Sequence, residues 1–526
     1  MKKINSILLI LMSLSIIFNS AEAQGKLSIE NVRSVYLRNS GTIMSANEIK
    51  GYFTFYESDK IDKHTNEYTV QITDENLNKI KDIKFEGDKN LRLLESSYNG
   101  SSIMFLFYDS KEKTLEYRSY GFDGNQKFSY VKELNNRSKM LIEETYGHTG
   151  EEGSNEALFD VRDLGYVTVY PVKEGKYFSY EVNYFFTDRK KQWTYEAAEE
   201  QDDKWEKAEY LGVTDSLVLF EVVKQKSMLG GNPHSWLMGL DIFSGKKVFE
   251  ISTEAENDYK FTPVNISTIN GERNFLLMGS YYDKGDNALK GKSLGLACWT
   301  MDPTGKLIAK KYNSWADDFS KFLKTNDRGK VDDIGYIYFH KIVQTSNGKF
   351  FAVGEGYKKE VSAGATALNI LSVMGGGRGS GISNFKVKVT NMVMMEFNDK
   401  FEIGAASVYE KYSNNVIMPA GAGFLSPHTM ALMVKAMGGF DYDYTVMDKT
   451  RSNFVVGYSD FEKGKDYRGR SFNSISYYND KFSTDKIKLE SKASSMKVFP
   501  AKTGSVMILE YFKKEKKLEL RLEKLN

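Results

Sequence analysis

The chain has 526 residues, of which 41% are hydrophobic and 27% are charged, so it can bury a large core and is not a disordered polymer. Lys and Arg number 72 against 70 Asp and Glu, which leaves no basic excess for binding nucleic acid. One cysteine, Cys298, excludes an intrachain disulfide, and five histidines leave few candidates for a metal site. We predict neither a metal nor a cofactor.

The first residues have the pattern of a cleavable export signal. Two lysines precede an apolar stretch over residues 7–18, and Ala21-Glu22-Ala23 is a small-residue cleavage pattern. Twelve residues are too few to span a bilayer as a helix, which takes about 20. We therefore expect a signal peptide over residues 1–23, a mature chain without a transmembrane segment, and a periplasmic or secreted location.

Short apolar runs recur along the mature chain, and several follow an Asn-Gly or Thr-Gly turn. Tyr and Phe, at 33 each, favour strands, and 43 Gly favour the turns between them. Unbroken apolarity over so few residues predicts strands that are covered on both faces. The runs begin near residues 52, 103, 217, 275, 350, 454 and 506.

Most of these runs are followed by an amphipathic strand that ends in a polar turn and a lysine. Asp, Asn and Gly in such turns supply positive φ angles or side-chain-to-backbone hydrogen bonds, so the pattern predicts tight hairpins. It occurs at residues 120–127, 240–246 and 300–306, and in weaker form at 395–400 and 476–481.

The spacing of the apolar runs predicts an all-β, degenerate β-propeller. Gaps of 51, 58, 75 and 52 residues suit a four-stranded blade with its loops, and gaps of 114 and 104 are close to twice that unit. The first long gap contains further strand-like sequence over residues 166–180, which gives seven or eight blades. A pair of β-sandwich domains is the alternative. Because we find no linker, we predict one domain over residues 24–526.

Few helices are expected. Residues 314–323 begin with a capping serine and space their aromatics three and four apart. Residues 430–437 follow Ser426-Pro427 and end at two glycines, which indicates a capped helix, although an apolar strand is the alternative. An insertion over residues 361–384 interrupts the strand pattern and contains a glycine-rich tract over residues 375–381.

Arg378 lies in that glycine-rich tract, whose backbone N–H groups could bind an anion. The surrounding sequence lacks the buried strand and the helix of a phosphate loop, so a flexible tip is the alternative. The apolar residues 367–371 of the same insertion suggest a finger that contacts a partner or covers the propeller opening.

The sequence Phe-Asp-Tyr-Asp-Tyr over residues 440–444 is a second candidate site. On a strand, Asp441 and Asp443 would share one face, and Tyr442 would lie on the other with two further aromatics. Such a carboxylate pair could act on a glycosidic bond or hold Ca²⁺, and the alternative is a solvent-facing hairpin. We take Arg378, Asp441, Tyr442 and Asp443 as candidate binding residues and assign no catalytic residue.

Other motifs fail on their context. Residues 291–295 match the G-x-S-x-G pattern of a hydrolase nucleophile, but strand-like sequence follows where a helix is required. The histidines do not cluster in the sequence, and Cys298, next to Trp299, is predicted to be a buried apolar side chain.

The export signal, the Asn-Gly turns before apolar runs and the D-x-x-G-K turns resemble exported propeller-like proteins of Gram-negative bacteria, a group of unknown function. The resemblance implies fold and compartment only, because this fold serves many activities. We expect a binding or scaffold protein that presents loops to a protein or glycan of the cell envelope. A carbohydrate-active enzyme that uses Asp441 and Asp443, or an envelope assembly factor, is the alternative.

Overall fold

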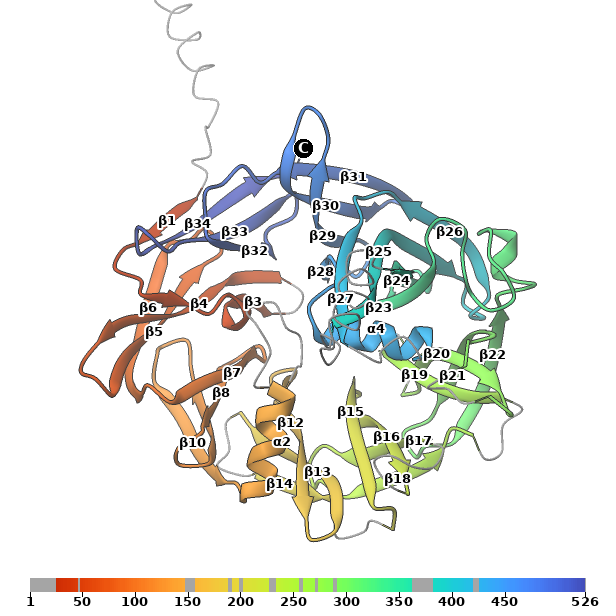
Figure 1. Ribbon diagram of the computed structural model, residues 1–526, viewed down its shortest axis with the longest axis horizontal. Coiled ribbons are helices and arrows are strands. Elements are labelled where there is room, and N and C mark those ends of the chain that lie inside the picture. The colour runs from red at the N-terminus through yellow and green to blue at the C-terminus, as the bar shows by residue number, and fades with distance from the viewer. Residues whose placement is uncertain are drawn as a thin grey trace, which may run out of the picture.

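The structure is a computed structural model, and it shows a closed ring of small antiparallel sheets (Figure 1). It describes residues 25–525 except for short segments at 46–47, 147–156, 188–191, 198–201, 227–232, 255–258, 270–272, 287–290, 362–381 and 420–424. The predicted signal peptide and Arg378 lie outside the described residues. Among the described helices, none is long and apolar enough to cross a membrane.

The described strands form seven sheets, and one of these, with eight strands, contains two blades joined by a single parallel bridge between Phe178 and Trp205. The ring therefore has eight blades, which confirms the prediction of a propeller with seven or eight. In most blades the strands run outward from the centre in chain order (Figure 1).

The first four blades consist of β2 (Ser34–Val35), β3 (Gly41–Ser45), β4 (Glu48–Lys60), β5 (Thr65–Asp74) and β6 (Lys79–Asp88); β7 (Leu91–Tyr98), β8 (Ile103–Asp109), β9 (Thr114–Tyr120) and β10 (Gln126–Glu133); β11 (Leu158–Val161), β12 (Gly165–Glu174), β13 (Tyr177–Phe186) and β14 (Gln192–Glu196); and β15 (Trp205–Val213), β16 (Leu217–Gln225), β17 (His234–Asp241) and β18 (Lys247–Ser252).

The last four blades consist of β19 (Tyr259–Thr268), β20 (Phe275–Asp283), β21 (Gly295–Met301) and β22 (Leu307–Ser314); β23 (Tyr336–Gln344), β24 (Phe350–Val361), β25 (Ile382–Phe397), β26 (Ile403–Tyr409) and β27 (Asn414–Pro419); β28 (Tyr442–Met447), β29 (Phe454–Lys463), β30 (Arg468–Tyr478) and β31 (Lys481–Lys488); and β32 (Ser495–Pro500), β33 (Ser505–Phe512), β34 (Lys517–Lys524) and the N-terminal β1 (Lys26–Ile29).

The apolar runs found in the sequence are the second strands of the blades. In β8, for example, every residue is buried, because its two faces pack against the neighbouring blades. The first long gap between runs contains β12 and thus a whole blade. The second long gap does not contain a further blade. Its length comes from residues 361–384 and from the chain between β26 and β28.

The polar turns ending in lysine form hairpins, as predicted, and the structure shows that they connect the third and fourth strands of their blades. In the turn from β21 to β22, Asp302 Oδ1 accepts hydrogen bonds from the backbone N–H groups of Thr304 at 2.8 Å and Lys306 at 3.0 Å. Gly305 completes this turn with a φ of +86°, which is favourable for glycine alone. These local bonds explain why the pattern is readable in the sequence.

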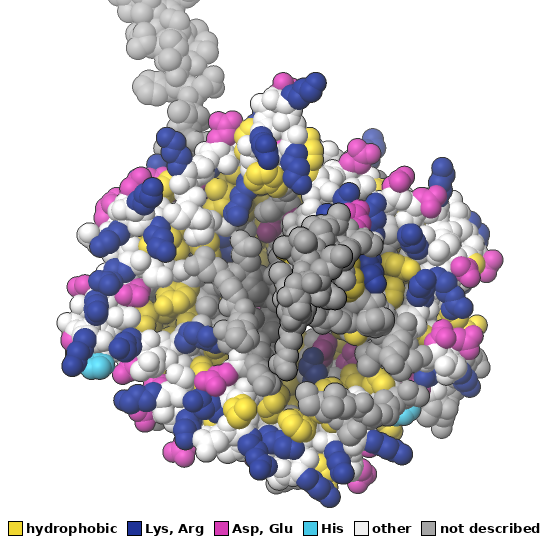
Figure 2. Space-filling model, in the orientation of Figure 1, with side chains coloured by type: hydrophobic (Ala, Val, Ile, Leu, Met, Phe, Trp, Pro, Cys, Tyr) yellow, Lys and Arg dark blue, Asp and Glu magenta, His cyan; other side chains and the backbone are white. Residues whose placement is uncertain are grey.

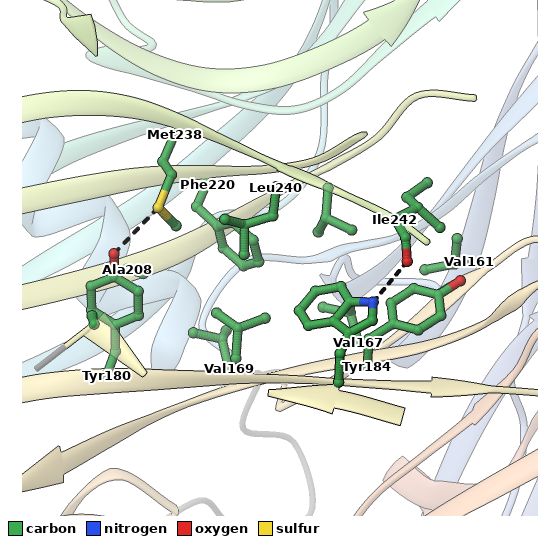
Figure 3. Close-up of a cluster of buried hydrophobic side chains, with 14 of the residues drawn as sticks. Val161, Val167, Val169, Tyr180, Tyr184, Ala208, Phe220, Met238, Leu240 and Ile242 are labelled. Carbon is green, nitrogen blue, oxygen red and sulfur yellow. Dashed lines mark hydrogen bonds between the residues drawn. The ribbon is translucent and has the colours of Figure 1, made fainter. Parts of the chain in front are cut away.

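Most of the core lies between blades. Figure 3 shows one such cluster, in which Val167 and Val169 of β12 face Phe220 of β16 and Leu240 of β17. Trp193 Nε1 donates to the carbonyl oxygen of Ile242 at 2.7 Å, whereas the buried Tyr184 hydroxyl has no hydrogen-bond partner among the described residues. Packing of sheet against sheet around the ring accounts for the many buried aromatics.

The ring closes by joining the two ends of the chain. β1 pairs antiparallel with β34, so the last blade takes its outermost strand from the N-terminus (Figure 1). The Tyr511 hydroxyl on β33 donates to the carbonyl oxygen of Arg33 at 2.7 Å, and the Val32 N–H donates to the carbonyl oxygen of Lys516 at 2.8 Å. Around the rim, side chains of both signs are interspersed (Figure 2).

The described helical elements are few: η1 (Leu37–Asn39), α2 (Asn136–Tyr146), η3 (Phe319–Lys321) and α4 (Pro427–Ala436). The capped helix after Ser426 is confirmed as α4, and the Ser426 side chain accepts from the Thr429 N–H. The predicted helix over residues 314–323 is wrong in extent. The tilted rings of Trp315 and Phe319 lie with their centres 4.4 Å apart and pack into the core, which leaves only one 3₁₀ turn. Helix α2 was not foreseen, although Asn135 caps it.

Candidate functional site

Blade 6 departs from the plan of the other blades. Its β25, with 16 residues, is the longest described strand, and part of it pairs with β27 as well as with β24. Helix α4 packs on one face of this added sheet through Met430, Ala431 and Val434. We call this part of blade 6 the extension. It consists of β27, α4, residues 382–389 of β25, which include the residues that pair with β27, and residues 357–361 of β24, which lie beside them. In Figure 1, α4 lies on the inner side of the ring, beside β23.

Two polar side chains enter the core where the extension meets the ring. His340 is the extra residue at a shift of register in β23. A second shift, between Glu355 and Tyr357 of β24, places the extra residue on β25, where Thr390 and Asn391 lie opposite Gly356. His340 Nε2 lies 3.2 Å from Glu355 Oε2, and the Glu355 side chain is completely buried. A buried carboxylate is costly unless it is paired and hydrogen-bonded, so the surroundings of Glu355 must supply donors.

Those donors come from the chain between β26 and β28. Lys411 Nζ lies 3.0 Å from Glu355 Oε1, is completely buried and also pairs with the Asp441 carboxylate. The backbone N–H groups of Asp441 and Tyr442 each donate to Glu355 at 3.2 Å. Glu355, Lys411, Asp441 and His340 thus form one cluster, which we call the ion cluster.

The ion cluster contains two carboxylates and one lysine. Burial raises the pKa of Glu355, but the charge of Lys411 and the His340 hydrogen bond outweigh it, so its pKa is lowered. Burial also raises the pKa of Asp441, to about 7, because Lys411 offsets that effect only in part and the charge of Glu355 adds to it. Burial lowers the pKa of His340. Near neutral pH the cluster therefore carries a proton on a share of Asp441.

Asp441 and Asp443 do not form the carboxylate pair on one face of a strand that the sequence predicted. A shift of register between Tyr442 and Tyr444 leaves Asp443 as the extra residue of β28. Asp443 is exposed and accepts a hydrogen bond from the Ser459 hydroxyl at 2.8 Å. Tyr442 stacks on His340, with ring centres 4.4 Å apart.

His340, Glu355 and Lys411 were not singled out as site residues. Glu355 carried the one available signal, because it is a lone acid directly after the apolar run Phe350–Gly354 in the same strand and so needs a buried partner. Nothing local identifies that partner, since Lys411 comes from another segment of the chain.

A second polar group faces the centre of the ring. Lys207 and Glu209 of the inner strand β15 pair at 2.7 Å, and the charge of His428 on α4 acts on Glu209. Glu221, buried behind them, accepts from the Ser235 hydroxyl at 2.6 Å, and burial raises its pKa to about 8. In the part of the chain that the structure describes, no three His, Cys, Asp or Glu side chains come together as metal ligands.

Comparison with known proteins identifies the family. A family of unknown function, DUF6770, matches residues 1–526. The chain belongs to this family. No curated protein matches the sequence.

Solved structures are similar at low identity. A quinohemoprotein alcohol dehydrogenase from Pseudomonas putida HK5 is 10% identical, with a TM-score of 0.44 over 94% of this chain and 80% of that one. The WD40 domain of SCAP from fission yeast is 7% identical, with a TM-score of 0.38 over 95% and 94%. Prolyl oligopeptidase B from Galerina marginata is 7% identical, with a TM-score of 0.39 over 92% and 56%.

Proposed function

We propose that this DUF6770 protein is an exported binding or scaffold protein that presents its extension to a protein or glycan partner of the cell envelope. The observation that carries the proposal is the position of Ile417 on β27. It is 67% exposed, the most of any large apolar side chain in the described chain, and it lies on the only blade with an added strand and a packed helix among those described. An apolar side chain held out on a rigid support can serve as the anchor of a binding interface.

The alternative of a carbohydrate-active enzyme has less support. Asp441 is held by Lys411 and accepts from Asn414 Nδ2 at 3.3 Å, so its oxygens are engaged within the protein. A general acid must reach the bond that it protonates. A binding role for the extension accounts for the added strand and helix without requiring Asp441 to reach a substrate.

Site-specific cross-linking can test the proposal. The variant Ile417→Cys places a thiol on the extension, and Ile80→Cys places one on blade 1, where Ile80 is 53% exposed. Cys298 is buried and does not compete for the reagent. We expect a defined envelope protein to cross-link from position 417 and not from position 80. The purified partner, or an envelope polysaccharide for a glycan, should then bind the Ile417→Lys variant at least tenfold more weakly, with Ile80→Lys unaffected.

Two results would contradict this function. Equal binding by the Ile417→Lys and Ile80→Lys variants would show that the extension does not contact the partner. Release of sugars from envelope polysaccharide, abolished by Asp441→Asn, would favour the enzyme.

A further inference from the structure

The strand register of the extension defines one face that points away from α4. Two rows of side chains cross β24, β25 and β27 on this face: Glu360, Lys386 and Ile417, and next to them Lys358, Lys388 and Asn415. Side chains directly opposite one another on paired strands share a face, and so do residues two apart on one strand. Val387 and Val416, which lie between the two rows, are on the other face and pack against α4. We call the two rows the outer face.

The outer face carries an excess of positive charge. Lys386 and Lys388 each pair with Glu360 at 3.6 Å, and all three side chains are 31% or 32% exposed. Lys358 Nζ donates to the carbonyl oxygen of Asp333 at 3.2 Å, a contact that does not neutralise its charge. Three lysines thus share one carboxylate on this face. Such an excess attracts acidic groups of a partner and disfavours basic ones.

Strand β27 is an edge of the same sheet. It pairs with β25, and within the described residues its backbone makes no hydrogen bond to any other segment. In an antiparallel ladder, alternate residues of an edge strand direct their N–H and C=O groups away from the neighbouring strand. Pro419 has no N–H and ends the edge. The edge over residues 414–418 can therefore accept a further strand.

The side chains beside this edge indicate the chemistry of such a strand. Its outward side chains would lie next to Asn415 and Ile417, both of which are exposed. Lys386 and Lys388 would lie two strand spacings away, about 10 Å, which a lysine and a carboxylate side chain can bridge together. Ile417 offers an apolar contact. These features favour a peptide over an acidic glycan, because a glycan lacks the regular N–H and C=O groups that pair with a strand edge.

We propose that the extension binds an extended acidic segment of a partner protein, which adds to β27 as a further strand and places alternate Asp or Glu side chains over Lys386 and Lys388. This inference rests on the function proposed above and names the class of partner. Backbone pairing with β27 supplies affinity, and the lysines and Ile417 select acidic and apolar side chains.

A displayed library of random peptides tests the charge on the full mature chain. We expect wild type to enrich peptides with Asp or Glu at every second position. The best of these, made synthetically, should bind the double variant Lys386→Glu, Lys388→Glu about tenfold more weakly or worse, because like charges then face each other. Lys359→Glu is the matched control, since this exposed lysine lies on the opposite face of the sheet, and it should retain binding. Added salt should weaken binding to wild type, a readout that needs no variant.

Backbone pairing is tested with the same synthetic peptide. N-methylation of one alternate set of its amides should abolish binding to wild type, and N-methylation of the other set should not, because only one set faces β27. Bound peptide should also slow hydrogen exchange at alternate amides of residues 414–418. The amides of β10, the outer strand of blade 2, should exchange as before.

Three outcomes would overturn this inference: enrichment without a preference for acidic residues, equal weakening by Lys359→Glu, or equal binding of the two N-methylated peptides. The outcomes also separate the two proposals. Acidic peptides that bind this edge while no envelope component cross-links from position 417 would contradict the proposed function alone. An envelope partner that cross-links from position 417, but is a glycan or binds the double variant as tightly as wild type, would contradict this inference alone.

Discussion

Gly305, in the turn of blade 5, lies directly against the ring of Phe249 in blade 4. A Cβ atom on Gly305 would come within 2.3 Å of Phe249 Cγ. The same relationship recurs one blade earlier, where a Cβ on Gly245 would come within 2.5 Å of Trp193 Cδ2. A glycine turn thus packs on an outer-strand aromatic of the preceding blade in both places.

Gly305→Ala should therefore destabilise the protein more than an ordinary change at positive φ. Gly348 is a matched control, because it has the same φ of +86° and nothing lies within 4 Å of its Cβ position. We expect about 1–2 kcal/mol for Gly348→Ala from backbone strain, and about 1–3 kcal/mol more for Gly305→Ala from overpacking. Urea unfolding measures both. Equal losses would mean that Phe249 moves aside freely.

Lys411→Met should be strongly destabilising, because it leaves Glu355 and Asp441 buried without their cation. Breaking a buried ion pair from one side costs about 3–5 kcal/mol. The control is Lys465→Met, in an exposed turn between β29 and β30. Chemical denaturation should show the loss for the first variant only. If both variants unfold alike, the ion cluster contributes nothing to stability.

Asp441 should make the stability of the protein fall as pH rises. Its pKa is raised from 3.8 to about 7 on folding, so the folded state binds more protons between these values. The favourable contribution is complete below about pH 4 and is lost as pH rises through 7, by up to about 1.4 kcal/mol per unit. Unfolding of wild type and Asp441→Asn from pH 4.5 to 8 measures the difference. A constant difference would contradict the raised pKa.

Closure of the ring should depend on Ile29. This residue of β1 is buried, pairs with Leu518 and packs in the core between blades 8 and 1. Ile29→Asp should unpair the closing strand and cost about 3 kcal/mol or more, because it buries an unpaired charge. Ser28→Asp, at the exposed neighbouring position, should change stability by less than about 0.5 kcal/mol. Thermal unfolding compares the two, and equal melting temperatures would show that β1 is dispensable.

Cys298 should be inert in the folded protein. It is 1% exposed, and burial raises the pKa of its thiol to about 12, so little thiolate forms at pH 8. We expect no labelling by a thiol reagent until the protein is unfolded in urea. Rapid labelling of the native protein would show that blade 5 opens locally.

The local chemistry of the chain predicted more of the fold than of the site. The turn around Asp302 and Gly305 is formed by hydrogen bonds between residues at most four apart. The unbroken apolar sequence of β8 predicts that both of its faces are covered, as they are. Such features are visible in a short window of sequence. The prediction for residues 314–323 failed where Trp315 and Phe319 pack into a core that a short window does not contain.

The sequence by itself determined the all-β class, the repetition of blades and the turns, because period and turn chemistry act over a few residues. It also indicated Asp441, Tyr442 and Asp443 as candidate binding residues, but it did not indicate which groups they contact. Only the tertiary structure brought Glu355 to His340 and Asp441, which are 15 and 86 residues away in the chain, and placed Lys411 between two carboxylates. Burial and neighbouring charge set the pKa of each group, and both arise only when distant segments pack together.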